Sequence, residues 1–182
     1  DPDNRLLWKQ NRRRLEVEPI RDALLAVSGQ LDLRLGGKLS DTPPDSKYTR
    51  TSQKPYDEKF RAIYLPIVRN RVYDMVAMFD FAESGVHLAK RTATTVAHQA
   101  LFMLNNPLVT EQAERLAEKL SEVEDENERL DRLYVTLFAR YPTVGERSSA
   151  GQFLTESEAS EQPAWSSLCR VLLASNEFVF VN

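Results

Sequence analysis

Few side chains in this sequence have the type and spacing that chemistry requires. His87 and His98 are eleven residues apart, and with Cys169 they supply three nitrogen or sulfur ligands, whereas a structural zinc site usually takes four. No serine lies in a G-x-S-x-G pattern, and the six glycines form no phosphate-binding loop. We therefore predict no metal and no cofactor in this chain. Cys169 shares an apolar stripe with Leu168 and Leu172, which indicates a buried thiol and not a nucleophile.

A second set of candidates consists of polar residues next to or inside apolar segments. They are Arg69, Asn70, Asp80, His98, Asn105, Asn176 and Glu177. In one interpretation each of them caps a helix or forms an internal ion pair, for example Arg69 with Asp80 or Glu177. In the other, several of them line a polar pocket that binds or transforms a ligand. We favour the first interpretation, because arginine and asparagine commonly satisfy helix ends.

Helices must position these residues, and the apolar spacing predicts six or seven of them. They are expected within 13–28, 72–79, 94–106, 107–120, 126–141, 143–154 and 165–172. Asn106 followed by Pro107 is typical of a helix start, and Thr143 with Glu146 forms a capping box. Pro19 either lies in the first turn of its helix or kinks a longer one. The sequence thus predicts a mostly α fold, an irregular orthogonal bundle with one or two short extended segments.

The remaining segments have no helical period. Residues 60–68 are rich in β-branched and aromatic side chains, and phenylalanine alternates with valine at the end of 177–181, so both segments are predicted to be extended. Residues 36–59, rich in Gly, Pro, Ser and Asp, are predicted to form a long surface loop. No internal repeat is visible. We expect one helical domain over residues 1–182.

Composition excludes several classes of protein. The chain has 182 residues, of which 42% are hydrophobic, and no run approaches the roughly 18 apolar residues of a membrane span. The net charge is -3, and residues 106–182 carry seven basic against fourteen acidic side chains. An acidic half disfavours nucleic acid as a partner, since phosphate binding needs a coherent positive face. The run Arg12–Arg14 is interpreted as a solvated surface; the alternative is a basic face shared with Lys9 and Arg21.

Five segments in the same order resemble a known family. They are RRRLEVEPIRDALLAVSG (12–29), IYLPIVRN (63–70), FDFA (79–82), TTVAHQALFMLNNP (94–107) and LLASNEFVFVN (172–182). They look like the C-terminal domain of planctomycete-type cytochrome-c-associated surface proteins, a domain of unknown function. The resemblance implies an exported protein of the periplasm or cell envelope, often with a haem domain upstream. This chain has no CxxCH, so haem is expected only in such a separate domain.

Two functions follow as hypotheses. The first is a non-catalytic helical module, a fragment of a larger multidomain protein, that packs against upstream domains of its own polypeptide or against an envelope protein. The first residue, Asp1, is not Met, which is one reason for expecting a fragment. Such a module should expose an apolar patch, for example around Trp8, Tyr64 or Phe178. The alternative is part of an enzyme that acts on an envelope or polysaccharide substrate through the polar pocket. The resemblance supplies no catalytic residues.

Overall fold

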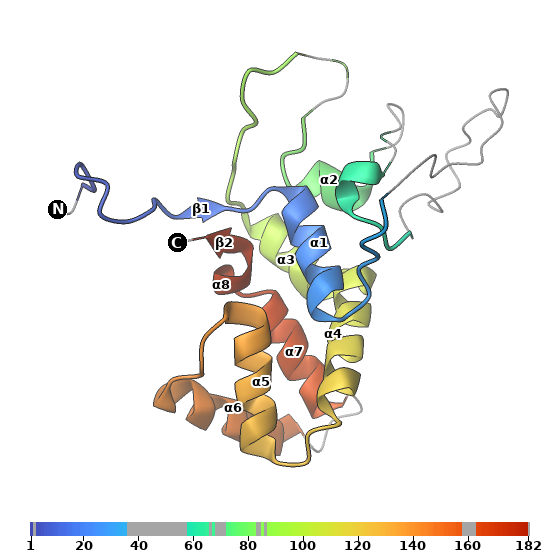
Figure 1. The fold of residues 1–182 in the computed structure, drawn as a ribbon, viewed down its shortest axis with the longest axis vertical. Helices are drawn as coiled ribbons and strands as arrows, with labels where there is room; N and C mark the ends of the chain where they lie inside the picture. Colours follow the sequence, from blue (N-terminus) through green and yellow to red (C-terminus); the bar gives the residue numbers. More distant parts are fainter. Residues whose placement is uncertain are drawn as a thin grey trace, which may run out of the picture. The chain divides into compact units, whose positions relative to one another are not determined.

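The fold is mostly helical, as predicted (Figure 1). This computed structural model describes residues 1, 3–35, 58–65, 67, 72–82, 85, 87–157 and 163–181. The elements are β1 (Arg13–Arg14), α1 (Val17–Val27), the 3-10 helix η2 (Ala62–Tyr64), α2 (Asp74–Met78), α3 (Ala97–Asn105), α4 (Pro107–Leu120), α5 (Glu126–Phe138), α6 (Val144–Ser157), α7 (Ala164–Leu173), α8 (Asn176–Val179) and β2 (Phe180–Val181). The predicted loop at 36–59 lies outside the described residues except for its last two.

The contacts divide the chain into two compact units. Unit 1 comprises residues 1–15 and 103–182, and unit 2 comprises residues 16–102. Each unit therefore has its own hydrophobic core and is described by itself. A single domain over the whole chain stays a prediction.

The core of unit 1 lies where α7 packs against α4, α5 and α6. Its most deeply buried side chains are Val109, Leu116, Leu133, Cys169 and Leu173. They come from helices whose apolar residues recur every three or four positions, so each helix presents one stripe to the others. The burial of Cys169 confirms that it behaves as a small apolar residue.

Helix starts in unit 1 follow the predicted capping chemistry. The side chain of Asn106 accepts a hydrogen bond from the Leu108 amide at 2.9 Å, and Pro107 takes the first helical position of α4. The Glu146 carboxylate accepts from the Thr143 amide at 2.7 Å, which completes the capping box before α6. The helix end predicted at Tyr141 is wrong, because the backbone turns left-handed at Ala139 and ends α5.

The strand predicted for 177–181 is correct only at its last two residues, because residues 177–179 are helical. A single turn, α8, first buries Phe178 and Val179, and β2 follows. β2 pairs antiparallel with β1, so that Arg14 lies opposite Phe180. The Leu15 amide continues this pairing by donating to the Val179 carbonyl at 2.8 Å.

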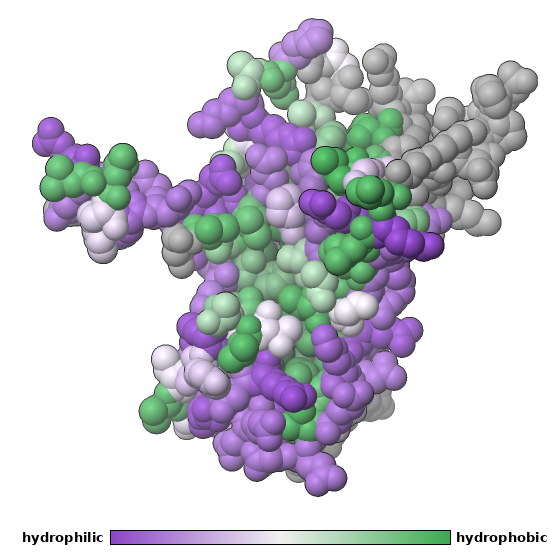
Figure 2. Space-filling view, viewed as in Figure 1, coloured by the Kyte–Doolittle hydropathy of each residue, from purple (hydrophilic) through white to green (hydrophobic). Residues whose placement is uncertain are grey.

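An N-terminal arm precedes β1 in unit 1. It consists of Asp1 and residues 3–12, and Figure 2 shows hydrophobic atoms gathered on it beside hydrophilic ones. The hydrophobic residues are Leu6, Leu7 and Trp8, which are 83%, 79% and 65% exposed. Of the apolar patch expected around Trp8, Tyr64 and Phe178, Trp8 is thus exposed, Tyr64 half-buried and Phe178 buried.

Unit 2 is built around α1, which packs against η2 and α2. Pro19 lies in the first turn of α1, where its missing N–H requires no acceptor within the helix, so the shorter of the two predicted helices is correct. Gly29 ends the helix region with a φ of 77°, a conformation that glycine adopts without steric cost. Ile20 and Leu24 are fully buried on the core face of α1.

Two local predictions in unit 2 are wrong. In the described part of the segment 60–68, Phe60 bridges to Asp32, but the chain then coils into η2 before Leu65 is extended again. Spacing also predicts that α3 turns Leu101 inward, but Leu101 is 55% exposed and Gln99 is buried. The buried Gln99 amide is satisfied, because its nitrogen donates to the Met78 carbonyl at 3.1 Å.

Candidate binding cavity of unit 2

A cavity of about 720 Å³ lies beside α1, within unit 2. Along α1 it is lined by Pro19, Asp22, Ala23 and Ala26, whose spacing of three and four residues places them on one helical face. This face differs from the core face that carries Ile20. Two alanines leave space that larger side chains would fill, and this is the local reason for the cavity.

The other walls come from η2, α2 and the segments next to them. Their apolar lining residues are Leu31, Ala62, Ile63, Leu65, Ile67, Tyr73, Met75, Val76 and Phe81. Ile63 is 73% exposed and Ile67 is 40% exposed, while Met75 is completely buried. The cavity therefore has an apolar floor and an apolar mouth that opens to solvent.

Asp22 joins the two sides of the cavity. Its Oδ1 accepts a hydrogen bond from the Ala62 amide at 2.7 Å, which ties the start of η2 to α1. Its carboxylate also lies 3.7 Å from the Arg21 guanidinium and 3.9 Å from that of Arg61. Arg21 in turn donates to the backbone carbonyls of Phe60, at 2.9 Å, and Glu58. These bonds hold the segment 58–62 against the helix.

Burial changes the proton affinity of both charged groups at this junction. Desolvation raises the pKa of Asp22, against the lowering effects of the Ala62 amide and of Arg21 and Arg61. Desolvation also lowers the pKa of Arg21, which is 3% exposed, although Asp22 opposes this shift. The charged form of each group is thus less stable here than in water. The junction therefore relies on its hydrogen bonds.

A second charged cluster lies at the start of α1. The Arg91 guanidinium donates to the Glu18 carboxylate at 2.8 Å and to Glu16 Oε2 at 2.9 Å. The Arg91 guanidinium also lies 4.7 Å from the centre of the Phe81 ring, a cation–π contact. All four residues line the cavity. Arg91 is thereby held between acidic and aromatic partners.

The described lining of this cavity combines apolar side chains with a few charged ones. No histidine, cysteine or serine is among its described lining residues, and Tyr73 supplies its hydroxyl. The charged side chains already bond to one another or to backbone groups. A nucleophile or general base must contact a carbon or a proton of its substrate, whereas these charged groups already bond within the protein. The cavity is therefore suited to receive apolar groups.

The residues predicted to form a polar pocket are distributed over several places. Arg69 and Asn70 lie outside the described residues. Asp80 and His98 belong to unit 2, whereas Asn105, Asn176 and Glu177 belong to unit 1. None of the described five lines the unit 2 cavity.

Asp80 has a local structural role. Its carboxylate accepts from the amide and the hydroxyl of Thr94, both at 2.8 Å, which fixes the segment before α3. Asp80 itself has a φ of 57°, a left-handed conformation that aspartate tolerates better than most residues. His98, Asn105 and Asn176 are exposed on their helices.

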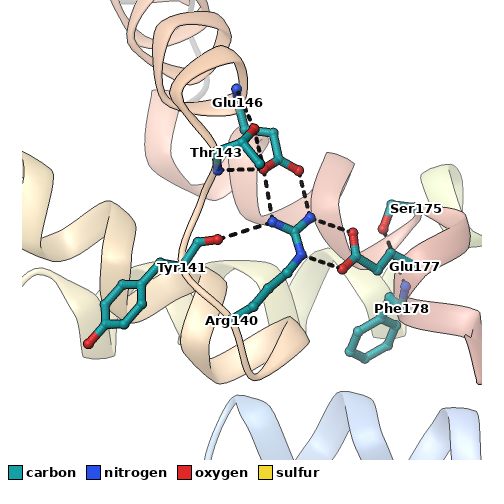
Figure 3. A network of polar contacts seen from close by, with 7 residues as sticks. All are labelled: Arg140, Tyr141, Thr143, Glu146, Ser175, Glu177 and Phe178. Carbon is teal, nitrogen blue, oxygen red and sulfur yellow. Dashed lines mark hydrogen bonds and ion pairs between the residues drawn. The ribbon is translucent and has the colours of Figure 1, made fainter. Parts of the chain in front are cut away.

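Glu177 belongs to an ion-pair network around Arg140 (Figure 3). The Arg140 Nε and Nη2 atoms each donate to Glu177 at 2.7 Å, while Nη1 and Nη2 donate to Glu146 at 2.9 and 2.6 Å. Nη1 also donates to the Tyr141 carbonyl at 3.1 Å. These five bonds use all five N–H donors of the guanidinium, so the network joins α6 to α8 and leaves no donor for a ligand.

The Arg140 network also shifts a pKa. Its hydrogen bonds to Glu146, together with those from Thr143, hold the pKa of that carboxyl at about 2, below its ordinary 4.5. Burial raises the pKa of the Cys169 thiol to about 12, which makes it unreactive at neutral pH. Among the described residues, no three His, Cys, Asp or Glu side chains come together as metal ligands would.

The residues that line the cavity could not be predicted from the pattern of polar residues in apolar segments. Ala23 and Ala26 carry no chemistry, and their role depends on the wall that faces them. One signal was present: Pro19, Ala23 and Ala26 form a face of small residues beside the stripe of Ile20 and Leu24. A helix with large residues on one side and small ones on the next allows a hollow there.

The structure is thus that of a mostly helical protein with a largely apolar cavity in unit 2. The chain belongs to the family described as "PSD1: Protein of unknown function (DUF1553)", which matches residues 1–154. No curated protein and no solved structure matches it. Of the helices described, none has the length and apolar character that a membrane crossing requires.

Proposed function

We propose that this chain is a non-catalytic interaction module whose unit 2 cavity receives an apolar segment from another domain of the same polypeptide. The observation that carries the proposal is the mouth of the cavity, where Ile63 and Ile67 are 73% and 40% exposed. Apolar side chains at the mouth of a cavity of about 720 Å³ gain free energy when apolar groups cover them.

The charged groups around the cavity support binding over catalysis. Asp22 is engaged by the Ala62 amide and two arginines, and Glu18 is engaged by Arg91. Charged groups that are already bonded within the protein can surround an entering segment. They provide specificity at the polar rim of an apolar contact. The module is thus a receptor for a protein segment.

The identity of the partner rests on the resemblance of five sequence segments to cytochrome-c-associated surface proteins. The proposal therefore includes an exported protein of the periplasm or cell envelope, with further domains before this one. Haem, where such a protein carries it, belongs to one of those domains. An envelope protein is the partner if no such domain exists.

An enzyme acting on polysaccharide is the second candidate. One observation favours it: Glu18 and Asp22 line the same cavity, and burial raises the pKa of Asp22. A pair of carboxyl groups in one cavity is the usual machinery of glycoside hydrolysis. Against it, the Ala62 amide, Arg21 and Arg61 all favour the ionised form of Asp22, which has no proton to donate to a leaving group.

A cross-linking experiment tests the proposed function. A photo-reactive amino acid replaces Ile63 in the full polypeptide, and the product is analysed by mass spectrometry. We expect cross-links to an apolar segment of another domain. Ala23→Leu, which adds apolar volume inside the cavity, should reduce their yield several-fold by occupying the binding space. The same amino acid at Val144, which is 89% exposed in unit 1, is the control.

Two outcomes would contradict this function. If Ile63 gives no more cross-links than Val144, the cavity has no partner in the polypeptide. If the chain hydrolyses polysaccharide and Glu18→Gln or Asp22→Asn abolishes that hydrolysis while the cross-links persist unchanged, the second candidate replaces the first.

A further inference from the structure

The N-terminal arm has an exposed apolar tip with a basic surround. Leu6, Leu7 and Trp8 are consecutive, and each is at least 65% exposed. Arg5 and Lys9 flank them directly, and Arg12 and Arg13 follow on exposed positions. The arm also exposes Asp1 and Asp3, so these basic residues exceed the acidic ones by four to two. Apolar side chains, an indole and an excess of cations are a composition that proteins use at the interface of an anionic membrane.

Four backbone amides in and next to the tip are bonded within the arm. The Asp1 carboxylate accepts from the amides of Arg5 at 2.9 Å and Leu6 at 2.7 Å. The Leu7 amide donates to the Asn4 carbonyl at 3.2 Å, and the Lys9 amide donates to Asn4 Oδ1 at 3.3 Å. These four amides therefore need no partner outside the arm.

The indole N–H of Trp8 is also bonded within the arm. Its indole nitrogen donates to the Asp1 carbonyl at 3.1 Å, so the ring can leave water without an unsatisfied donor. The Lys9 ammonium lies 4.9 Å from the ring centre and keeps a positive charge beside it. Leu7 has a φ of 52°, a left-handed conformation that is unfavourable for residues with a Cβ. This strained position is nevertheless occupied by an exposed leucine.

These features discriminate between two kinds of partner. A protein groove supplies hydrogen-bond partners and commonly pairs with the amides of an inserted segment. The hydrocarbon region of a bilayer supplies none, so amides that enter it are more stable when they are already bonded within the arm. Three neighbouring apolar side chains also need no shaped pocket in a fluid phase, and the basic residues on both sides match a plane of phosphates.

We propose that the N-terminal arm inserts Leu6, Leu7 and Trp8 into the surface of an anionic lipid membrane while its arginine and lysine side chains bind lipid phosphates. This inference does not depend on the unit 2 cavity. It concerns a surface of unit 1 and a different class of partner, so either proposal can fail alone.

Vesicle sedimentation of the whole chain tests it, with vesicles of equal parts phosphatidylcholine and phosphatidylglycerol and vesicles of pure phosphatidylcholine. We expect binding to the anionic vesicles that weakens with salt. Leu6→Asp with Leu7→Asp should reduce it at least about tenfold, because the apolar contribution is lost. Val144→Asp is the matched control, since Val144 is exposed elsewhere in unit 1, and it should change nothing.

Two variants separate insertion from plain charge attraction. Asn4→Gly leaves the net charge unchanged and tolerates the φ of 52° at this position, but it removes the acceptor of the Lys9 amide. Asp1→Ala removes a negative charge together with the acceptors of two amides. Both should weaken vesicle binding several-fold, because the freed amides resist insertion. Attraction by charge alone predicts stronger binding for Asp1→Ala.

Insertion has a spectroscopic signature as well. In the Trp165→Phe variant Trp8 is the one remaining indole, and its emission should shift to the blue with anionic vesicles. The proposal is overturned if anionic vesicles neither bind the chain nor shift this emission. It is also overturned if Asp1→Ala strengthens binding, or if the leucines are needed instead for self-association of the chain in the absence of lipid.

Discussion

At the scale of single residues, charge in this protein serves the fold. Arg140 illustrates this most clearly, since its guanidinium makes five hydrogen bonds to two carboxylates and a carbonyl. Asp80 and Asp22 likewise accept backbone amides from segments far along the chain. The same residue types in an enzyme would face a substrate. Here they join helices and loops to one another.

Glu146 leads to a prediction about acid stability. Its pKa is about 2 in the fold and 4.5 ordinarily, so the folded state binds this proton less readily than the unfolded chain. Its contribution is fully present above pH 4.5 and is lost as the pH falls toward 2. Glu146→Gln should therefore lower the free energy of unfolding by about 1 kcal/mol at pH 7, a value already reduced for its partial exposure.

Urea unfolding at several pH values measures this effect. The difference between the natural chain and Glu146→Gln should shrink as the pH falls below 4.5. Glu118→Gln is the control, because Glu118 pairs with Arg115 at 3.3 Å on an exposed helix surface, where such pairs contribute little. A difference that stays constant down to pH 2 would show that the Arg140 network does not hold Glu146 ionised.

At the scale of elements, the sequence was informative wherever the cause was local. The start of α4 follows from Asn106 and Pro107, and the start of α6 follows from the Thr143 capping box. The inward face of α3 could not be predicted, because the burial of Gln99 depends on the Met78 carbonyl, which is distant in sequence. α5 ends before Tyr141 because Ala139 adopts a left-handed conformation, and no typical turn residue at that position predicts this.

The candidate site was less predictable than the elements for the same reason. The cavity depends on Ala23 and Ala26 facing Ile63 across a space, and only the fold brings those residues together. Of the polar residues singled out in the sequence, Asp80 accepts the Thr94 amide and Glu177 pairs with Arg140, so these two serve the fold and not the cavity. Unusual polar residues mark local bonding needs, whereas an apolar cavity is marked by small residues.

Two glycines give a prediction at this scale. Gly29 has a φ of 77° after α1, so Gly29→Ala should lower the free energy of unfolding by about 1 kcal/mol. Gly151 lies within α6, and a Cβ added there meets no atom within 4 Å. Gly151→Ala should raise the free energy of unfolding by about 0.5–1 kcal/mol. Thermal or urea unfolding of both variants measures the two effects, and equal signs would contradict the assigned backbone conformations.

At the scale of the whole molecule, the two units differ in what they expose. Unit 1 buries its helices around α7 and carries the apolar arm, while unit 2 carries an open apolar cavity. Membership of the PSD1 family gives no activity. Both proposed functions therefore concern surfaces: a protein segment is proposed for the unit 2 cavity, and a lipid surface for the N-terminal arm.

The central claim, that the unit 2 cavity is covered by another domain of the same polypeptide, is tested most directly by hydrogen exchange. Amide exchange is measured over α1 and over residues 58–65, in this chain alone and in the full polypeptide. We predict slower exchange at both places in the full polypeptide, with α6 unchanged as the internal control. Equal exchange rates around the cavity in the two proteins, or a gene that encodes no further domain, would contradict the claim.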